Sequence, residues 1–264
     1  MSLLSWVYNH KEQLSIEFST DDWSSKFCLK LFDYESSIKH NNMEFYGRGV
    51  DEVESVAILK SVSEVIERVI CNEYGITSVG LSIQSTQDNI FDSDSHAKDE
   101  ILERYFLKKH IENGVPFRMI EATGPMVSEF KKHNSSSKMQ FFKMNTPVGY
   151  YGVGCLLELN DKASIGFAFS YIEIKTIEKA FTEALPNLFW LQENDIKDEE
   201  KPFHLQLSFI SKVKSLLGLT ATNIKIETQL PDIVGQKIDL SEHGLFATAP
   251  IRITSFRIKE NEID

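Results

Sequence analysis

The feature that most constrains the fold is a long amphipathic segment at 51–73, DEVESVAILKSVSEVIERVICNE. At about 100° per residue its apolar side chains fall on one arc, which predicts a helix that buries one face. Asp51 can cap the start of this helix, and Gly75 can stop it. The rest of the chain must supply an apolar surface for this arc, which is formed by Ile58, Val62, Val65, Ile66, Val69 and Ile70.

Segments with strand-like and helix-like patterns alternate irregularly along the chain. Apolar and polar residues alternate at 12–18 and 26–32, which predicts two strands, and a short strand at 43–46 is predicted to end in a turn at Gly47-Arg48-Gly49. This mixture lacks strict βαβ order, so we expect an α+β fold with a mixed, largely antiparallel sheet and packed helices. Further helices are predicted at about 95–113, 124–134, 173–185 (cut by Pro186) and 203–217, and further strands at 77–85, 117–122, within 138–170, near 222–228 and near 245–258.

The length and composition indicate a folded chain with an acidic balance. We expect a single domain over 1–264, with a loop or sub-boundary near 192–201. The formal net charge is −11, from 28 Lys and Arg against 39 Asp and Glu, which argues against a nucleic-acid coat protein. No apolar run reaches the roughly 18 residues of a membrane span. The three cysteines lie far apart and favour a reducing compartment, so we expect a cytoplasmic protein. From the acidic charge and the lack of a long apolar run, we expect neither nucleic-acid nor membrane partners.

Polar side chains gather on the face of the predicted 51–73 helix that lies opposite its apolar arc. Four of them, in the pattern SxxExxER, fall within about 120° of one another on a helix: Ser61, Glu64, Glu67 and Arg68. The same pattern also fits an ordinary solvent-facing surface, on which Glu64 and Arg68 form an i,i+4 ion pair.

A second ExxER motif comprises Glu100, Glu103 and Arg104. Apolar residues flank it on nearly all sides of the predicted helix, which predicts a buried helix, and buried carboxylates need a paired charge or a metal ion. Carboxylates suit Mg²⁺, which commonly bridges protein oxygens to nucleotide phosphates, and arginine side chains suit phosphate oxygens. The sequence contains neither a Walker loop nor GxGxxG, so a nucleotide site here would not use a standard phosphate loop.

Three segments resemble, in order, the signatures of the YcaO family. Segment 46–68 resembles the first signature, with SxxExxER on a helix; 77–106 resembles the second, in which Ser and polar residues precede a helix with ExxER. Lys179-Ala-Phe-Thr-Glu183 resembles the third, where the family usually has Arg and then Glu four residues on. YcaO proteins use ATP and Mg²⁺ to phosphorylate a backbone amide oxygen, and a nucleophile then gives an azoline, thioamide or amidine, often on ribosomally made peptides.

The resemblance implies a metal site and a nucleotide site, residue by residue. The residues implied to hold Mg²⁺ are Glu64, Glu67, Asp92, Glu100, Glu103 and Glu183. The residues implied to contact ATP are Ser61, Arg68, Ser85, Asp88, Arg104 and Lys179. No residue is implied to act as a general acid or base.

Several positions depart from the family pattern. Asp88 stands where the family usually has Asn, Asp92 where it has Glu, and Lys179 where it has Arg, so Lys179 keeps the charge but loses the bidentate fork. Pro186 lies where the third helix would continue, and the usual downstream Arg is missing. The stretch between the two ExxER motifs is also short for the family.

The function implied is that of an ATP- and Mg²⁺-dependent enzyme acting on a backbone amide of a peptide or protein. At 264 residues the chain is short for a fused peptide-recognition domain plus the full enzyme, so we expect a separate partner protein that presents the substrate. A homodimer is compatible with the resemblance. The departures leave open a non-catalytic YcaO-like subunit that scaffolds or activates a peptide-modifying enzyme. A chance resemblance would leave a plain α+β ligand-binding module.

Overall fold

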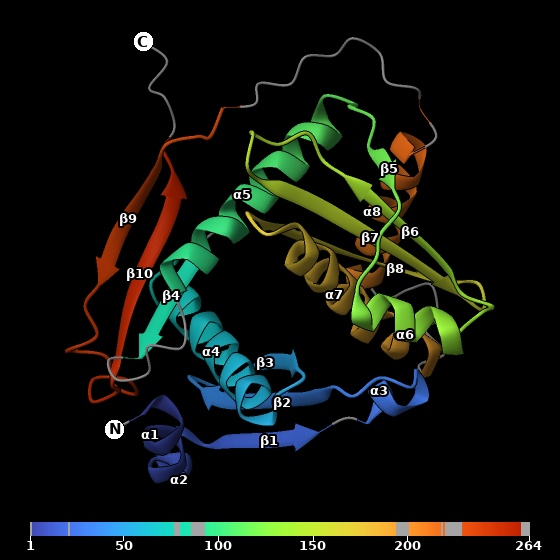
Figure 1. Ribbon diagram of the computed structural model, residues 1–264. Coiled ribbons are helices and arrows are strands. Elements are labelled where there is room, and N and C mark those ends of the chain that lie inside the picture. The colour runs from blue at the N-terminus through green and yellow to red at the C-terminus, as the bar shows by residue number, and fades with distance from the viewer. Residues whose placement is uncertain are drawn as a thin grey trace, which may run out of the picture. The chain divides into compact units, whose positions relative to one another are not determined.

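The computed structural model describes residues 2–20, 22–76, 80–85, 93–193, 201–217, 219 and 229–259. Every strand pairing among them is antiparallel, and helices pack on the sheets, so the fold is α+β as predicted (Figure 1). The helices are α1 (Leu3–Asn9), α2 (Lys11–Leu14), α3 (Trp23–Lys26), α4 (Glu54–Glu73), α5 (Ser93–Glu112), α6 (Pro125–His133), α7 (Glu173–Glu193) and α8 (Lys201–Leu217). The strands are β1 (Ile16–Thr20), β2 (Phe32–His40), β3 (Met43–Asp51), β4 (Gly80–Ser85), β5 (Arg118–Ile120), β6 (Lys138–Lys143), β7 (Tyr151–Leu159), β8 (Lys162–Ser170), β9 (Ile233–Ile238) and β10 (Ile251–Ile258).

The chain divides into two compact units, which are described separately. The first contains Met1–Ile101 and Pro231–Asp264, and the second contains Leu102–Leu230, so the division falls inside α5. The expectation of one domain over 1–264 stays a prediction. Most of the predicted loop near 192–201, namely 194–200, lies outside the described residues.

The first unit is built around α4. Its two three-stranded sheets have the orders β1-β2-β3 and β4-β10-β9, and α4 packs against β3 and β2. The apolar arc predicted from the sequence is buried: Val62, Val65 and Val69 are fully covered. Residues of α1, β1, β2, β4 and β10 complete this core, which is the apolar surface that the amphipathic pattern required.

The sequence predicted the C-terminal end of α4 correctly but not the residue that caps its N-terminal end. The helix begins at Glu54, and Asp51 does not cap it but accepts a hydrogen bond (3.0 Å) from the backbone N–H of Val53 in the preceding turn. At the other end Gly75 has φ +61°, and the N–H of Ile76 donates to the carbonyl of Cys71 at 2.9 Å. This is a Schellman end, for which glycine is the favoured residue.

The glycines at 47 and 49 serve close packing and not the predicted turn. β3 runs through both positions without a break, in register with β2 from Phe32↔Asp51 to His40↔Met43. A Cβ atom at Gly47 would lie 2.2 Å from the carbonyl oxygen of Ser61, and one at Gly49 would lie 1.9 Å from that of Ala57. The two glycines therefore let β3 lie directly against the backbone of α4.

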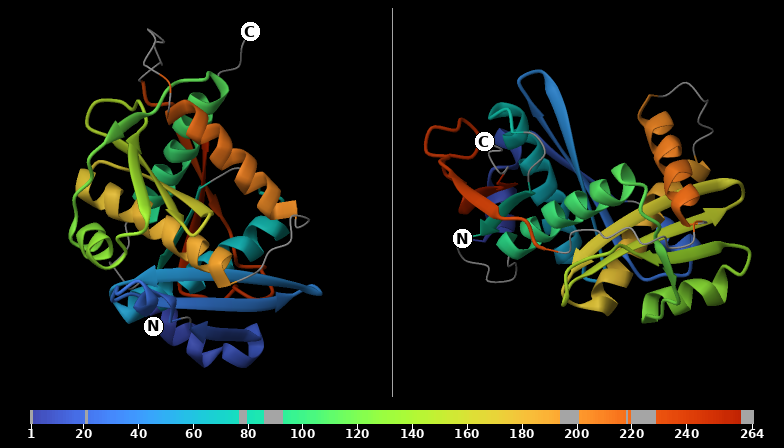
Figure 2. Two further views of the ribbon diagram at one scale, coloured as in Figure 1. Left: turned by 90° about the vertical axis from the view of Figure 1, so that its right-hand side faces the viewer. Right: turned by 90° about the horizontal axis from the view of Figure 1, so that it is seen from above.

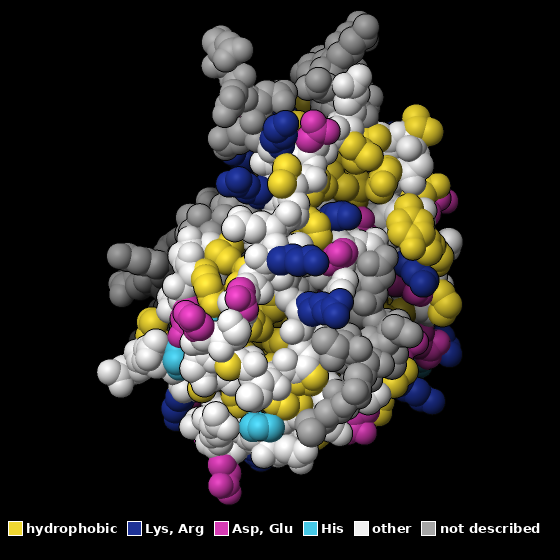
Figure 3. All heavy atoms as spheres, turned by 90° about the vertical axis from the view of Figure 1, so that its left-hand side faces the viewer, with side chains coloured by type: hydrophobic (Ala, Val, Ile, Leu, Met, Phe, Trp, Pro, Cys, Tyr) yellow, Lys and Arg dark blue, Asp and Glu magenta, His cyan; other side chains and the backbone are white. Residues whose placement is uncertain are grey.

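The second sheet of the first unit carries exposed basic side chains on an otherwise acidic chain. Figure 3 faces the side on which Figure 1 shows β9 and β10, and Lys and Arg side chains gather over its middle. The exposed basic residues of these strands are Lys237, Arg252 and Arg257. β9 was not predicted. The strand predicted near 222–228 lies on residues that are not described, and the strand predicted near 245–258 corresponds to β10.

The second unit contains a four-stranded antiparallel sheet in the order β5-β6-β7-β8. α7 packs on β8 and β7 (Figure 2), and Gly166 lets it approach, since a Cβ there would lie 2.3 Å from the carbonyl oxygen of Ala180. The strand-like runs predicted within 138–170 correspond to β6, β7 and β8, and the short helix predicted at 124–134 corresponds to α6.

The predicted end of the third helix at Pro186 is wrong, because α7 continues to Glu193. A proline inside a helix costs about 3 kcal/mol. After the proline, Leu188, Phe189 and Leu191 are all buried, and burial of such side chains stabilises by about 1.5–3 kcal/mol each. Apolar burial beyond Pro186 therefore outweighs the lost helical hydrogen bond.

The two N-terminal strand predictions are shifted from the observed strands. Ser15 adopts a left-handed conformation (φ 47°) that ends α2, so β1 begins only at Ile16. Phe27, Leu29 and Leu31 are buried in alternation as the pattern indicated, yet this stretch joins no sheet: the N–H groups of Phe27 and Leu29 donate to the carbonyl of Ser24, and β2 starts at Phe32. Periodicity thus identified the buried side chains but not the hydrogen-bonded strand.

Within the described residues, no helix combines the length and the apolar character needed to cross a lipid bilayer.

Candidate functional site

The polar face of α4 carries the SxxExxER residues in the first unit. Ser61 is fully buried, and its hydroxyl donates to the carbonyl of Ile58 at 2.9 Å. Glu64 and Glu67 are partly exposed, one turn apart, and Arg68 is exposed. Within this unit the structure therefore brings two carboxylates and a guanidinium to one accessible helix face.

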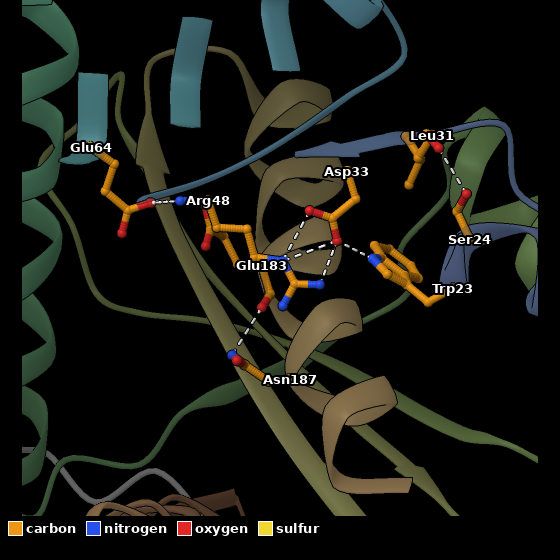
Figure 4. Close-up of polar contacts among 8 residues, drawn as sticks. All are labelled: Trp23, Ser24, Leu31, Asp33, Arg48, Glu64, Glu183 and Asn187. Atoms are coloured by element: carbon orange, nitrogen blue, oxygen red, sulfur yellow. Dashed lines mark hydrogen bonds and ion pairs between the residues drawn. The ribbon is translucent and has the colours of Figure 1, made fainter. Parts of the chain in front are cut away.

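Glu64 is held by two donors. Its Oε2 atom accepts the backbone N–H of Arg48 in β3 at 2.7 Å (Figure 4), and its Oε1 atom pairs with the guanidinium of Arg68 at 2.5 Å. The ordinary i,i+4 pair considered for the sequence is thus present. The contact from β3 is additional, and it depends on the close approach that Gly47 and Gly49 permit.

The side chain of Arg48 belongs to a polar network that the sequence reasoning missed. Its Nε atom donates to both carboxylate oxygens of Asp33 at 3.0 Å, and its Nη2 atom also contacts Oδ2. Asp33 in β2 is buried, and the indole N–H of Trp23 donates to it as well (Figure 4). A buried carboxylate needs such partners, so this network fixes the position of residue 48 and, through its backbone N–H, the orientation of Glu64.

One signal in the sequence could have indicated this network. Asp33 lies among alternating residues at the start of β2, on the side that the pattern assigns to the interior. A charged residue at an inward position predicts a charged partner on the neighbouring strand.

The second signature is only partly described. Ser85 is the last residue of β4 and pairs in register with Ile251. Asp88 and Asp92, predicted to contact ATP and Mg²⁺, lie outside the described residues.

The ExxER motif of α5 spans the division between the two units. Glu100 belongs to the first unit, and Glu103 and Arg104 belong to the second. The expected burial of this helix on nearly all sides is wrong: Glu100 and Glu103 are partly exposed and Arg104 is exposed. Its buried side chains are Ala97 and Ile101 in the first unit and Leu102, Phe106 and His110 in the second.

The third signature lies on α7 in the second unit. Lys179 is partly exposed and Glu183 is exposed one turn later, so both reach the surface of the helix. Thr182 and Asn187, their neighbours, direct their side chains to the carbonyls of Lys179 (3.0 Å) and Glu183 (3.3 Å).

The carboxylates of α4 fit the chemistry of Mg²⁺ but form no complete cage. No set of three or more His, Cys, Asp or Glu residues among those described is arranged to hold a metal ion by itself. Mg²⁺ in nucleotide sites usually takes only one or two protein carboxylates and completes its shell with phosphates and water. Glu64 and Glu67, with accessible hard oxygen donors, match that mode of binding.

Comparison of the whole fold with solved structures identifies its type. A YcaO from Methanopyrus kandleri, bound with AMPPCP and Mg²⁺, superposes with a TM-score of 0.67 over 97% of this chain and 89% of its own. The chain has the YcaO fold. The identity is 12%, so the likeness to that YcaO structure is one of fold, and the recognition made from three short motifs is confirmed at that level.

A second YcaO-like neighbour is larger. A heterocyclase solved in complex with substrate and cofactor also has a TM-score of 0.67, at 8% identity over 98% of this chain. The chain spans about half of that structure, 52%. No protein-family model matches the sequence, and no curated protein matches it either.

Proposed function

We propose that the chain is an ATP- and Mg²⁺-dependent YcaO-type enzyme that phosphorylates a backbone amide oxygen of a peptide or protein. The observation that best supports the proposal is the carboxylate pair on α4, in a fold like that of a YcaO bound with AMPPCP and Mg²⁺. Glu64 is oriented by the backbone N–H of Arg48, so this carboxylate is preorganised before any ligand binds.

When bound, Mg²⁺ supplies charge neutralisation at the phosphates. The carboxylates of the three signatures would hold the ion, and their basic and other polar side chains would contact the nucleotide. The proposed ion-holding residues are Glu64, Glu67, Asp92, Glu100, Glu103 and Glu183, and the proposed phosphate and nucleotide contacts are Ser61, Arg68, Ser85, Asp88, Arg104 and Lys179.

The proposed chemistry is a phosphoryl transfer followed by substitution. The amide oxygen attacks the γ-phosphorus, the bond to the bridging oxygen breaks and ADP leaves. A nucleophile then adds to the activated amide carbon, and phosphate departs with the former amide oxygen, giving an azoline, thioamide or amidine. The residues named here contribute orientation and electrostatic stabilisation.

The proposal includes a cytoplasmic setting and partners. The heterocyclase neighbour was solved with its substrate, which supports a peptide as the substrate class. A separate protein would present this peptide, and a homodimer is compatible with the fold.

Calorimetric titration of ATP, with and without Mg²⁺, tests the proposal. Glu67→Gln in the first unit and Glu103→Gln in the second each remove one charge with little change in shape. Glu112→Gln is the control, because Glu112 is exposed on the same helix as Glu103 and pairs only weakly with Lys108 at 3.8 Å. We expect Mg²⁺-dependent binding in the wild type and the control, and at least tenfold weaker binding in both test variants. No binding at millimolar ATP would exclude the enzyme function for the isolated chain.

One observation favours the alternative, a non-catalytic YcaO-like subunit. Lys179 replaces the usual Arg, and the remainder of α7 contains no arginine, so its phosphate-binding capacity is reduced. A scaffold would bind its partner enzyme equally well as wild type and as Glu67→Gln, whereas partner-dependent activity lost in Glu67→Gln supports catalysis.

A further inference from the structure

A pocket of about 480 Å³ lies at the C-terminal end of α4, in the first unit and beyond the SxxExxER residues. Its walls come from the β2–β3 turn, the end of α4 and the turn that precedes β10. None of the described residues that line it is Lys or Arg. The side chains that define its chemistry are Asn41, Asn72, Glu73, Tyr74, Glu242 and His243.

Glu73 is the anchored anion of this pocket. Its Oε1 atom contacts Nε2 of His40, and its Oε2 atom contacts Nε2 of His243. The carboxylate side chain is still 23% exposed, whereas the side chain of His243 is only 1% exposed. The two imidazoles therefore fix the carboxylate from behind while part of it stays accessible.

The hydrogen bonds of His243 determine which of its nitrogens carries the proton. Nδ1 accepts the backbone N–H groups of Leu245 and Phe246, each at 3.2 Å, so it is unprotonated and the proton lies on Nε2. Nε2 is buried, has no hydrogen bond of regular geometry to a described residue, and faces Glu73. Burial also lowers the pKa of His243, with Glu73 opposing and His40 adding to this effect. His243 therefore directs an Nε2–H toward the carboxylate of Glu73.

In this tautomer neither ring nitrogen of His243 offers a free lone pair to a metal ion, because the lone pair of Nδ1 accepts the two backbone N–H groups. A ring nitrogen that carries a proton has no lone pair for a metal, and the described residues contain no group suited to hold one. The pocket thus offers a fixed negative charge without the ligand set of a metal site.

Other features of the pocket also favour positive charge. It lies at the negative end of the α4 dipole, and the last turn of α4 has no basic residue that would balance it. Glu242 adds a second carboxylate, and the amide side chains of Asn41 and Asn72 add carbonyl oxygens. Tyr74 stacks on His243 with ring centroids 6.2 Å apart and supplies an aromatic wall.

We propose that this pocket binds an organic cation, namely the ammonium or guanidinium group of a peptide. The cationic group pairs with Glu73, and Glu242 and the two amide oxygens accept its remaining N–H donors. That the cation belongs to a peptide rests on the proposed function, whereas the preference for a cation rests on the pocket alone.

Titration with methylguanidinium and methylammonium chloride tests the pocket in the absence of nucleotide. Long-range ¹H–¹⁵N spectra of the histidine side chains report both the tautomer of His243 and ligand binding, with sodium chloride at equal ionic strength as the salt reference. Glu73→Gln and Glu242→Gln each remove one pocket charge. Glu35→Gln is the matched control, because Glu35 is exposed on β2 in the same unit and does not line the pocket.

We expect an Nε2–H tautomer for His243 and saturable shifts at His40 and His243 with at least one cation. The dissociation constant should rise at least tenfold in Glu73→Gln, severalfold in Glu242→Gln and not at all in Glu35→Gln. An acetylated peptide amide with one arginine, and a peptide with a free amino terminus but no basic side chain, then identify the source of the cation. Binding of either peptide supports the proposal.

Absence of saturable shifts with both small cations, or equal affinity in Glu73→Gln and Glu35→Gln, would overturn the proposal. If Glu73→Gln fails to fold, Glu242→Gln decides, because Glu242 is exposed, whereas Glu73 is the carboxylate that pairs with both histidines. If the chain binds the small cations but not Mg·ATP, only the proposed function is refuted. If it binds Mg·ATP but neither cation, only the proposal for the pocket is refuted.

Discussion

Replacement of Gly49 by alanine tests the contact between β3 and α4 on which the orientation of Glu64 depends. The added Cβ would lie 1.9 Å from the carbonyl oxygen of Ala57 and 2.6 Å from the backbone nitrogen of Ser61, where ordinary contacts begin at 3.4 Å. Both obstacles are backbone atoms, so relief requires the strand and the helix to separate by about 1.5 Å. Overpacking costs about 1–3 kcal/mol and occasionally more, and we place this substitution at about 3 kcal/mol because neither obstacle is a flexible side chain.

Thermal unfolding followed by circular dichroism measures the expected loss. For a chain of this size, about 3 kcal/mol corresponds to a fall in Tm of roughly 6–12 °C. The same separation would stretch the 2.7 Å contact between the N–H of Arg48 and Glu64 beyond hydrogen-bonding distance. Mg·ATP affinity should therefore fall as well under conditions where the variant is still folded.

Gly244→Ala provides the control for this experiment. A Cβ at Gly244 would meet nothing within 4 Å, and its backbone is not left-handed. The substitution should leave Tm unchanged or raise it slightly, since alanine restricts the unfolded chain. Equal Tm values for Gly49→Ala and Gly244→Ala would refute the argument that glycine is required for close packing.

Three further predictions concern buried polar groups and the end of α4. Asp33→Ala should destabilise the first unit by about 3–5 kcal/mol, because Arg48 loses the partner of a buried ion pair; urea unfolding that shows less than 1 kcal/mol would contradict this. His110 is buried and neutral, accepting the N–H of Asn145 at 2.7 Å, and burial lowers its pKa. The unfolded state then binds a proton more readily, so the free energy of unfolding should fall as the pH drops from about 6.5 towards the lowered pKa. His110→Gln should make the free energy of unfolding, measured from pH 7.5 to 5, depend less on pH. Gly75→Ala should cost about 1 kcal/mol by forcing alanine into a left-handed conformation, and no change in Tm would argue against the Schellman end.

The parts of the fold that depend on local sequence were predictable, and those that depend on tertiary packing were not. The apolar arc of α4 repeats at helical spacing, so the helix and its buried face followed from the sequence. Pro186 and the glycines at 47 and 49 were interpreted by their usual local preferences, as a helix end and a turn. In the structure, apolar burial lets α7 continue past the proline. The two glycines pack against α4, a contact that cannot be predicted from the sequence of β3 alone.

The candidate site follows the same division. The ExxER pattern located the carboxylates of α4, because helical spacing alone brings Glu64 and Glu67 to one face. The hydrogen bond from the backbone N–H of Arg48 to Glu64 could not be predicted in the same way. The direction of this N–H depends on how β2, β3 and α4 are placed against one another. The inward position of Asp33 could have indicated a charged partner, but the sequence does not state which strand will lie beside it.

The SxxExxER residues differ in how much they contribute to the packing of α4 against β3. Ser61 is buried against β3 with its hydroxyl on a helix carbonyl, and Glu64 joins α4 to β3, so substitution of either would disturb packing as well as any ligand. Glu64 accepts from Arg48 and Arg68, whereas Glu67 lies one turn further along the same face, so Glu67→Gln removes a carboxylate charge and leaves both contacts of Glu64 in place. If Glu64→Gln lowers both Tm and nucleotide affinity while Glu67→Gln lowers affinity alone, the motif both joins the first unit and binds the ligand. If both variants lower Tm to the same extent, the carboxylates of α4 stabilise the fold and the case for a catalytic site on this helix is lost.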